Sequence, residues 1–371
     1  MTHTADFTSA DWARISETWQ TWWDGSLERP MIIIEAYEAS SSFSFADLYP
    51  NLTQYGLDTP TEQILNTIQI VLDSVHWMGD ALPRWYPNFG PGILAGCLGS
   101  PVKFANGTTW FEPLKETDVS DIGAFQPSID WGNPWWQRVE AVTRAAVERW
   151  GDHLCVGITD LGGNLDILAS LCGSERLLTA MVEMPDEVIR LTGQITSIWL
   201  ECFKRLCTMS IQQHGCCGWA PLWMPQAGYM LQSDLSYMIS PRMFTKYALP
   251  DLVACCQSMP YGFYHLDGKG EIPHLKSILE IPNLKGIQWI PGEGAPPPEE
   301  WLDLLSGIRS AGKLCQLYVT PQGAQKIIQA LGGKGFAFYL WEESEHLGHR
   351  DLTPQEGEAA LVLLEREGVI I

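Results

Sequence analysis

An α/β fold of the (β/α)8 barrel type is what this sequence of 371 residues predicts. From residue 134 onward, short apolar runs of strand length alternate with segments of helical period, which is the pattern of parallel β/α units. Seven strands can be counted in the chain, and an eighth can lie in the irregular segment 79–136. No G-x-G-x-x-G follows a strand and no P-loop is present, which disfavours the runner-up, a doubly wound sheet.

The first third of the chain is less regular than the rest. Residues 1–30 predict a helix, because Trp residues recur at helical spacing before a proline. The β-branched run Met31–Ala36 predicts a buried strand, and Leu57–Asp73 is amphipathic with helical period. The segment 79–136 is rich in Gly, Pro and aromatic residues, so it is either a cap over a site or an inert insertion.

The regular units occupy 137–371, and we treat 1–371 as one barrel domain with an aromatic-rich N-terminal section. The strands expected in this region are His153–Thr159, Gly218–Met224, Tyr261–Asp267, Lys285–Ile290, Lys313–Val319 and Gly335–Leu340. The helices expected are 134–150, 174–183, 185–213, one from Pro241 broken near Pro250, 298–310, Pro321–Leu331 and Pro354–Glu367.

Charge and composition exclude several classes of protein. The net charge of -21, from 23 Lys+Arg against 44 Asp+Glu, repels nucleic-acid backbones and anionic membranes. No apolar run reaches the ~18 residues of a membrane span, and the start of the chain does not resemble a signal peptide. The ten cysteines show no C-x-x-C spacing, so we expect a cytoplasmic protein whose cysteines are mostly buried apolar residues.

The segment Tyr261–Gly270 carries the most informative residues. An aromatic run of strand length ends at Gly268, and His265 and Asp267 stand two apart near its end. Residues i and i+2 of a strand share a face, so an imidazole and a carboxylate would project side by side. Barrel enzymes present metal ligands or acid–base pairs in this way. The alternative is that both side chains only hydrogen-bond a neighbouring loop.

Polar and aromatic side chains also follow the other predicted strands. Because a barrel carries its site at the strand C-termini, these residues are candidates for that site. They are Asp160, Trp223, Gln226, Asp234, Gln288, Trp289, Gln316, Trp341, Glu342 and Glu343.

Two chemical interpretations compete for this set. In the first, His265, Asp267 and either Glu342 or Glu343 hold a divalent metal, zinc above all, with an open fourth position. In the second, carboxylates act as general acid and base on a sugar or polyol that stacks on Trp faces. In either case Asp160 and Asp234 are acid–base candidates. A third interpretation is that several of these groups only cap helices, with Asp160 the clearest example.

Four segments together resemble the uroporphyrinogen decarboxylase superfamily, in particular its corrinoid-linked methyltransferases. Asp160–Pro185 is similar to the family's strand end, small-residue turn and G-x-E-x-L-L…P helix, and Ser233–Phe244 resembles its SP-x-x-F…P segment. His265-Leu-Asp267-Gly268 aligns with the family's His-x-Cys-Gly, and Gly286–Trp289 with a strand carrying an aromatic residue. The resemblance covers about residues 140–371 well and the N-terminal third loosely.

The resemblance implies a (β/α)8 barrel with a zinc site at the strand C-termini. His265 matches the family's zinc-binding His, whereas Asp267 stands where a Cys ligand would be and Glu342 near the place of a second Cys. Such a harder ligand set suits Zn²⁺, Mn²⁺ or Fe²⁺ with an oxygen-bearing substrate. A corrinoid would be carried by a partner protein, because the chain has no Asp-x-His-x-x-Gly loop.

The sequence therefore predicts a methyltransferase-like enzyme that moves a methyl group from a small, neutral, oxygen-bearing substrate to a corrinoid protein. Its substrate-binding candidates are Trp223, Gln226, Gln288, Trp289, Gln316 and Trp341. Two alternatives remain open: a carboxylate-based lyase, decarboxylase or hydrolase acting on a sugar-like molecule, and a non-catalytic binding barrel. The partners we consider are a small-molecule substrate, a corrinoid protein and a second copy of the chain in a homodimer.

Overall fold

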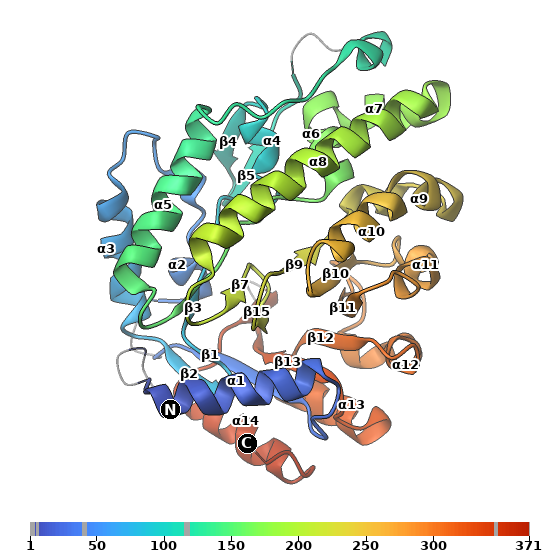
Figure 1. Ribbon diagram of the computed structural model, residues 1–371. Helices are drawn as coiled ribbons and strands as arrows, with labels where there is room; N and C mark the ends of the chain where they lie inside the picture. The colour runs from blue at the N-terminus through green and yellow to red at the C-terminus, as the bar shows by residue number, and fades with distance from the viewer. Residues whose placement is uncertain (1–3, 5–6, 39–42, 115–118, 345–347, 371) are drawn as a thin grey trace.

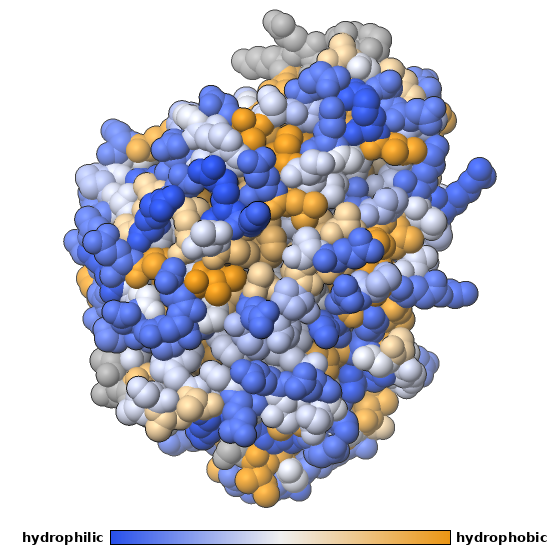
Figure 2. Space-filling model, in the orientation of Figure 1, coloured by the Kyte–Doolittle hydropathy of each residue, from blue (hydrophilic) through white to orange (hydrophobic). Residues whose placement is uncertain are grey.

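The computed structural model of the chain describes residues 4, 7–38, 43–114, 119–344 and 348–370. It confirms an α/β fold in which a mostly parallel sheet is surrounded by helices. Figure 1 shows helices outside the central strands, with α1 and α14 in the lower part of the view and α7 and α8 in the upper part. Hydrophilic residues cover most of the face seen in Figure 2, as the charge of -21 leads one to expect.

The central sheet has seven strands in the order β2-β1-β13-β12-β11-β10-β9. All neighbours in it are parallel except β1 and β2. Its strands are β1 Met31–Ala36, β2 His76–Gly79, β9 Gly228–Leu231, β10 Tyr261–Asp267, β11 Leu284–Ile290, β12 Leu314–Val319 and β13 Phe336–Leu340.

Four two-stranded sheets accompany the central one. Only the first is parallel, and it joins the segment 79–136 to the first regular β/α unit, so this irregular segment does contain a strand. The four pairs are β3 Arg84–Trp85 with β6 Cys155–Val156, β4 Val102–Ala105 with β5 Thr108–Phe111, β7 Cys216–Cys217 with β8 Trp223–Met224, and β14 Glu342–Ser344 with β15 Gly348–Arg350.

The helices agree closely with the predicted ones from residue 174 onward. The α-helices are α1 Ser9–Trp23, α2 Phe45–Leu48, α3 Thr61–Leu72, α4 Leu94–Cys97, α5 Pro134–Trp150, α6 Asn164–Cys172, α7 Ser174–Glu183, α8 Pro185–Ser210, α9 Pro241–Tyr247, α10 Leu249–Gln257, α11 Leu275–Leu279, α12 Leu302–Ser310, α13 Pro321–Leu331 and α14 Pro354–Glu365. Short 3-10 helices are η2 Leu52–Gln54, η3 Val119–Ala124, η4 Asp234–Met238, η5 Ile272–His274 and η6 Pro298–Glu300.

Helix α1 packs its tryptophans against the N-terminal ends of the central strands. The indole N–H of Trp22 donates to the carbonyl of Phe336, the first residue of β13, at 3.0 Å. The indole of Trp23 donates to the carbonyl of Trp223 at 2.8 Å and contacts the ring of Tyr261, the first residue of β10. A buried indole needs a partner for its N–H, and here backbone carbonyls supply it. These tryptophans therefore belong to the core.

Two local predictions differ from the structure. The expected strand Gly218–Met224 is replaced by parts of the antiparallel pair β7–β8, and the strand that joins the central sheet is β9, four residues later. The expected strand His153–Thr159 is reduced to β6, Cys155–Val156, which pairs with β3 outside the central sheet. In both places Gly and other small residues permit several local conformations, and the choice is made by contacts with distant strands.

Candidate active site

Three potential metal ligands converge at the C-terminal end of β10. His265 and Asp267 lie on one face of this strand, and Asp234 reaches them from η4, which follows β9. One ligand atom of each residue lies within 4.8 Å of the others. Among the described residues this is the group of His, Cys, Asp and Glu side chains that could hold a metal ion. One imidazole nitrogen and two carboxylates suit a divalent cation of intermediate to hard character.

A chain of amides on the neighbouring strands holds the imidazole of His265 in place. Its Nδ1 lies 2.5 Å from Oε1 of Gln288, and Nε2 of Gln288 donates to Oε1 of Gln316 at 2.5 Å. Because Gln288 uses its nitrogen on Gln316, its oxygen accepts from Nδ1–H of His265. That tautomer leaves Nε2 of His265 unprotonated and able to bind a cation. Burial lowers the pKa of His265, which favours this neutral form.

Asp160 lies beside this group, at the end of the segment that follows β6. Its Oδ1 accepts from the hydroxyl of Tyr229 and from the backbone N–H of Gly162, both at 2.8 Å. Both bonds go to one oxygen, so Oδ2 is the atom left for a ligand. Burial raises the pKa of Asp160 to about 6, while these two hydrogen bonds and the charge of His265 act in the opposite direction.

Asp166 fixes the start of η4. Its carboxylate accepts from the backbone N–H of Asp234 at 3.0 Å and from that of Leu235 at 2.7 Å. The loops can approach so closely because residue 163 is glycine: a Cβ there would lie 2.3 Å from both Oδ2 of Asp166 and the carbonyl oxygen of Gln232. Burial and then the charge of Asp234 raise the pKa of Asp166 to about 7.

Asp234 keeps solvent-accessible surface, although protein atoms crowd its carboxylate. This desolvation, followed by the charges of Asp267 and Asp160, raises its pKa to about 7. The site therefore brings several carboxyl groups together without enough positively charged side chains to balance them. Acidic groups held close together in this way are stabilised when a cation binds between them.

A pocket of about 460 Å³ adjoins the cluster. Asp160 and Trp219 belong to its wall, and the ring of Trp219 meets that of His265 edge to face at 5.1 Å. The other polar side chains of the lining are uncharged amides, phenols and a hydroxyl: Asn51, Gln54, Asn88, Tyr49, Tyr86 and Thr108. Residues of the segments 45–54 and 86–108 thus supply this part of the lining. Its lining suits a small neutral molecule with hydrogen-bonding groups.

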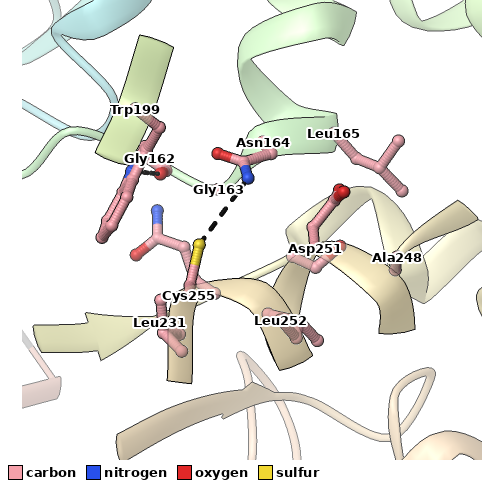
Figure 3. A pocket seen from close by; sticks show the side chains of 12 residues that line it. Gly162, Gly163, Asn164, Leu165, Trp199, Leu231, Ala248, Asp251, Leu252 and Cys255 are labelled. Atoms are coloured by element: carbon pink, nitrogen blue, oxygen red, sulfur yellow. Dashed lines mark hydrogen bonds between the residues drawn. The ribbon is translucent and has the colours of Figure 1, made fainter. Parts of the chain in front are cut away.

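A second, water-sized cavity of about 10 Å³ lies behind the turn at Gly162 and Gly163 (Figure 3). There Asn164 Nδ2 donates to Thr196 at 2.9 Å and faces the sulfur of Cys255 at 3.8 Å. Thr196 in turn donates to Asp251 at 2.9 Å. A cavity of this size holds one water molecule at most. It is therefore too small for a substrate and belongs to the packing of α6, α8 and α10.

Asp251 makes the stability of the protein depend on pH. Burial raises its pKa from 3.8 to about 7, so between these values the folded protein binds more protons than the unfolded chain and stability falls as pH rises. At about 1.4 kcal/mol per pH unit, this corresponds to at most about 4 kcal/mol. We expect Asp251→Asn to flatten the loss of unfolding free energy between pH 4 and 7 in urea titrations. Equal slopes for variant and wild type would contradict this assignment.

Several predicted site residues lie away from the cluster. Trp223 and Gln226 precede β9 and lie near the first residue of β10, at the edge of the sheet opposite His265. Trp289 points away from Gln288 and packs against Trp301 under η6. Glu342 and Glu343 lie in the β14–β15 hairpin, where they pair with Arg350 and His349, and neither is in the described ligand cluster. Trp341 stacks between Tyr318 and His349 on a separate cavity.

Three residues that surround the ligand cluster were not predicted from the sequence. Asp166, Trp219 and Tyr229 each touch or position a group of the site. Asp234 was expected as an acid–base residue, and the structure places it among potential metal ligands. Asp166 follows Asp160 by six residues, and this pair of acidic residues could have drawn attention to it. Nothing local in the sequence marks Trp219 or Tyr229.

No protein-family model and no curated protein matches the sequence. A solved structure described as a methyltransferase from Methanosarcina mazei is similar in fold, with a TM-score of 0.61 and 11% sequence identity. The match covers 95% of this chain and 98% of that chain. The two proteins therefore share a fold over essentially their whole lengths, and at this identity the likeness concerns the fold alone. In the described part of the chain no helix is long and apolar enough to cross a membrane.

Proposed function

We propose that the protein is a metal-dependent methyltransferase of the uroporphyrinogen decarboxylase-like superfamily. In this proposal it moves a methyl group from a small, neutral, oxygen-bearing substrate to a corrinoid carried by a partner protein. The observation that carries it is the convergence of Asp234, His265 and Asp267 beside a pocket of uncharged polar residues. The sequence motifs and the fold shared with a protein named as a methyltransferase support the class of reaction.

We extend the same proposal to the fold and infer a closed (β/α)8 barrel. Three contacts support closure beyond the strands of the central sheet. β3 pairs with β6, the backbone N–H of Ile158 donates to the carbonyl of Cys217, and Arg84 donates to the carbonyl of Gly218 at 3.0 Å. These contacts connect β3, β6 and β7, which lie in the chain between β2 and β9, the two edge strands of the central sheet. A closed barrel would bring all strand C-termini to one face.

Asp234, His265 and Asp267 would hold the cation, with zinc the first expectation. When bound there, the cation would act as a Lewis acid on the oxygen of the substrate. The chain's own residues orient this arrangement: Gln288 fixes the imidazole, and Asp166 fixes the backbone of Asp234. Thiolate ligands, which favour sulfur chemistry, are absent from the described cluster, and its oxygen-rich donors favour an oxygen-bearing substrate.

Asp160 is placed to manage the proton of the leaving group. In the transfer, the bond between methyl carbon and substrate oxygen breaks, and the carbon bonds to the Co(I) corrinoid, whose cobalt supplies the electron pair. The substrate oxygen then needs a proton. With a pKa of about 6, a fraction of Asp160 is protonated at neutral pH, and the residue lines the pocket. Such a group can serve as general acid.

We expect Asp160→Asn to lower methyl transfer by about 100-fold or more, which is the usual contribution of a general acid. The assay mixes the protein with methanol or 2-methoxyphenol and cob(I)alamin and follows methylcobalamin by absorbance. Asp303→Asn is the matched control, because Asp303 is an exposed carboxylate on α12. Absence of transfer from every methoxylated compound by the wild-type protein would count against the proposed reaction.

The second candidate is a lyase or hydrolase that works on a sugar-like molecule by carboxylate chemistry. The raised pKa values of Asp160, Asp166 and Asp234 favour it, because such groups can exchange protons near neutral pH. This reaction would need neither metal nor corrinoid. Turnover of a sugar or polyol by protein treated with EDTA would select this candidate over the first.

A further inference from the structure

A cavity of about 890 Å³ lies between the C-terminal ends of β1, β12 and β13 and the β14–β15 hairpin. Its wall shares Phe45 and Ala46 with the smaller pocket, but it includes none of the three potential metal ligands. The volume falls in the range of binding sites for small organic molecules. The proposed methyl transfer therefore does not explain this cavity.

Six of the fourteen residues of the wall carry aromatic rings: Tyr37, Phe43, Phe45, Tyr318, Tyr339 and Trp341. Trp341 stacks on Tyr318, whereas Tyr339 is inclined to both of its aromatic neighbours in the wall. The ring of Tyr339 meets that of Phe45 at 83° and that of Tyr318 at 58°, so neighbouring rings form the corners of a box. Corners of this kind present the negative faces of several rings to one ligand, which is the arrangement that attracts organic ammonium ions.

The charged residues of the wall also favour a cation. Glu38, Asp351 and Glu356 are acidic, and the guanidinium of Arg350 is bound by both carboxylate oxygens of Glu356, at 2.8 and 2.6 Å. Asp351 accepts the backbone N–H of Phe45 at 2.7 Å, and burial raises its pKa, as expected for a carboxylate without a full counter-charge. Burial lowers the pKa of His349, which keeps that ring neutral. An anion would be repelled here, and a cation would be stabilised.

Two of the tyrosines are almost fully buried behind the surface of the cavity. Tyr37 and Tyr339 are 4% and 3% exposed, and their oxygens are buried without a hydrogen-bond partner in the described part of the chain. A ligand in the cavity would therefore meet the rings of these residues and not their hydroxyls. Burial raises the pKa of both phenols well above the ordinary value, so they stay neutral and do not supply the charge.

We propose that this cavity, boxed by Tyr37, Phe45 and Tyr339 and made acidic by Asp351, binds a small organic ammonium ion. A ligand with methyl groups on nitrogen fits the rings and the charges of this wall. The methylated cation contacts the rings, and the carboxylates balance its charge. Binding does not depend on the metal cluster, so this inference and the proposed function can fail separately.

The test uses calorimetric titration of the full-length protein after EDTA treatment, so that the result is independent of metal. The probes are choline, tetramethylammonium and 3,3-dimethylbutan-1-ol, a neutral molecule with the shape of choline. We expect choline to bind saturably and at least about tenfold more tightly than the neutral analogue. Equal affinities for choline and its neutral analogue, or no saturable binding of either cation, would overturn the proposal.

Two variants connect the binding to the wall. Asp351→Asn removes one charge and keeps the oxygen that accepts from Phe45, so choline affinity should fall about tenfold with the fold intact. Glu365→Gln removes a charge from an exposed position of α14 and should leave the affinity unchanged. Phe45→Leu keeps an apolar side chain but removes one ring face, and should weaken choline more than the neutral analogue. Retained choline affinity in both Asp351→Asn and Phe45→Leu would place the ligand elsewhere.

Discussion

Purified His265→Ala protein is expected to keep less than about a tenth of the divalent metal that the wild-type protein binds. The substitution removes the only nitrogen ligand of a cluster whose three ligand atoms lie within 4.8 Å of one another. Even loss of a group that merely orients a ligand weakens metal binding by about 10- to 100-fold, and loss of a ligand should weaken it at least as much. Plasma mass spectrometry of the dialysed proteins gives the metal content directly.

The same measurement identifies the third ligand. Asp234→Asn should also lose metal, whereas Glu342→Gln should retain it, because Glu342 lies in the β14–β15 hairpin and pairs with Arg350 in the strand ladder. Thermal unfolding of each variant shows whether the fold is intact. Metal retained in folded His265→Ala protein would contradict the ligand cluster. Metal lost from Glu342→Gln but not from Asp234→Asn would restore the ligand set predicted from the sequence.

The sequence was most informative where local pattern and tertiary structure agree. The strand Tyr261–Asp267 was predicted residue for residue, because an aromatic run ends at a glycine with φ of 75° that turns the chain away. The helix Pro321–Leu331 was equally clear, since proline opens it and Gly332 closes it. Once β10 was correct, the period of two residues placed His265 and Asp267 on one face.

The sequence was least informative where partners lie far apart along the chain. The segment 216–231 contains three short strands, and only the last joins the central sheet, by pairing with Tyr261–Tyr264. A choice of this kind depends on register with a distant strand, which no local pattern records. For this reason Trp223 and Gln226 were expected at the wrong end of the sheet. For the same reason the sequence did not predict that Asp234 and Trp219 lie close to His265.

The second large effect concerns a buried ion pair between Glu35 of β1 and Arg84 of β3. Arg84 Nε donates to Glu35 at 2.7 Å, and their side chains are only 4% and 1% exposed. Tyr49 also donates to Glu35, and burial raises the pKa of that carboxyl despite the neighbouring guanidinium. Two charges out of water attract each other strongly, but each was costly to bury. The pair is therefore stable only as long as both members are present.

Arg84→Met should lower the free energy of unfolding by about 3–5 kcal/mol, because it leaves the carboxylate of Glu35 buried without a counter-charge. The double variant Glu35→Gln with Arg84→Met removes both charges and should recover a large part of this loss. Lys103→Met, which breaks an exposed pair with Glu112, is the control and should cost no more than about 1 kcal/mol. Urea unfolding of the wild type, Glu35→Gln, Arg84→Met and the double variant measures the cycle. If the double variant is as unstable as the sum of its single variants, the two residues do not stabilise the fold as a pair. Recovery in the double variant would instead show that the cost lies in the unpaired charge, and that the pair itself adds little to stability.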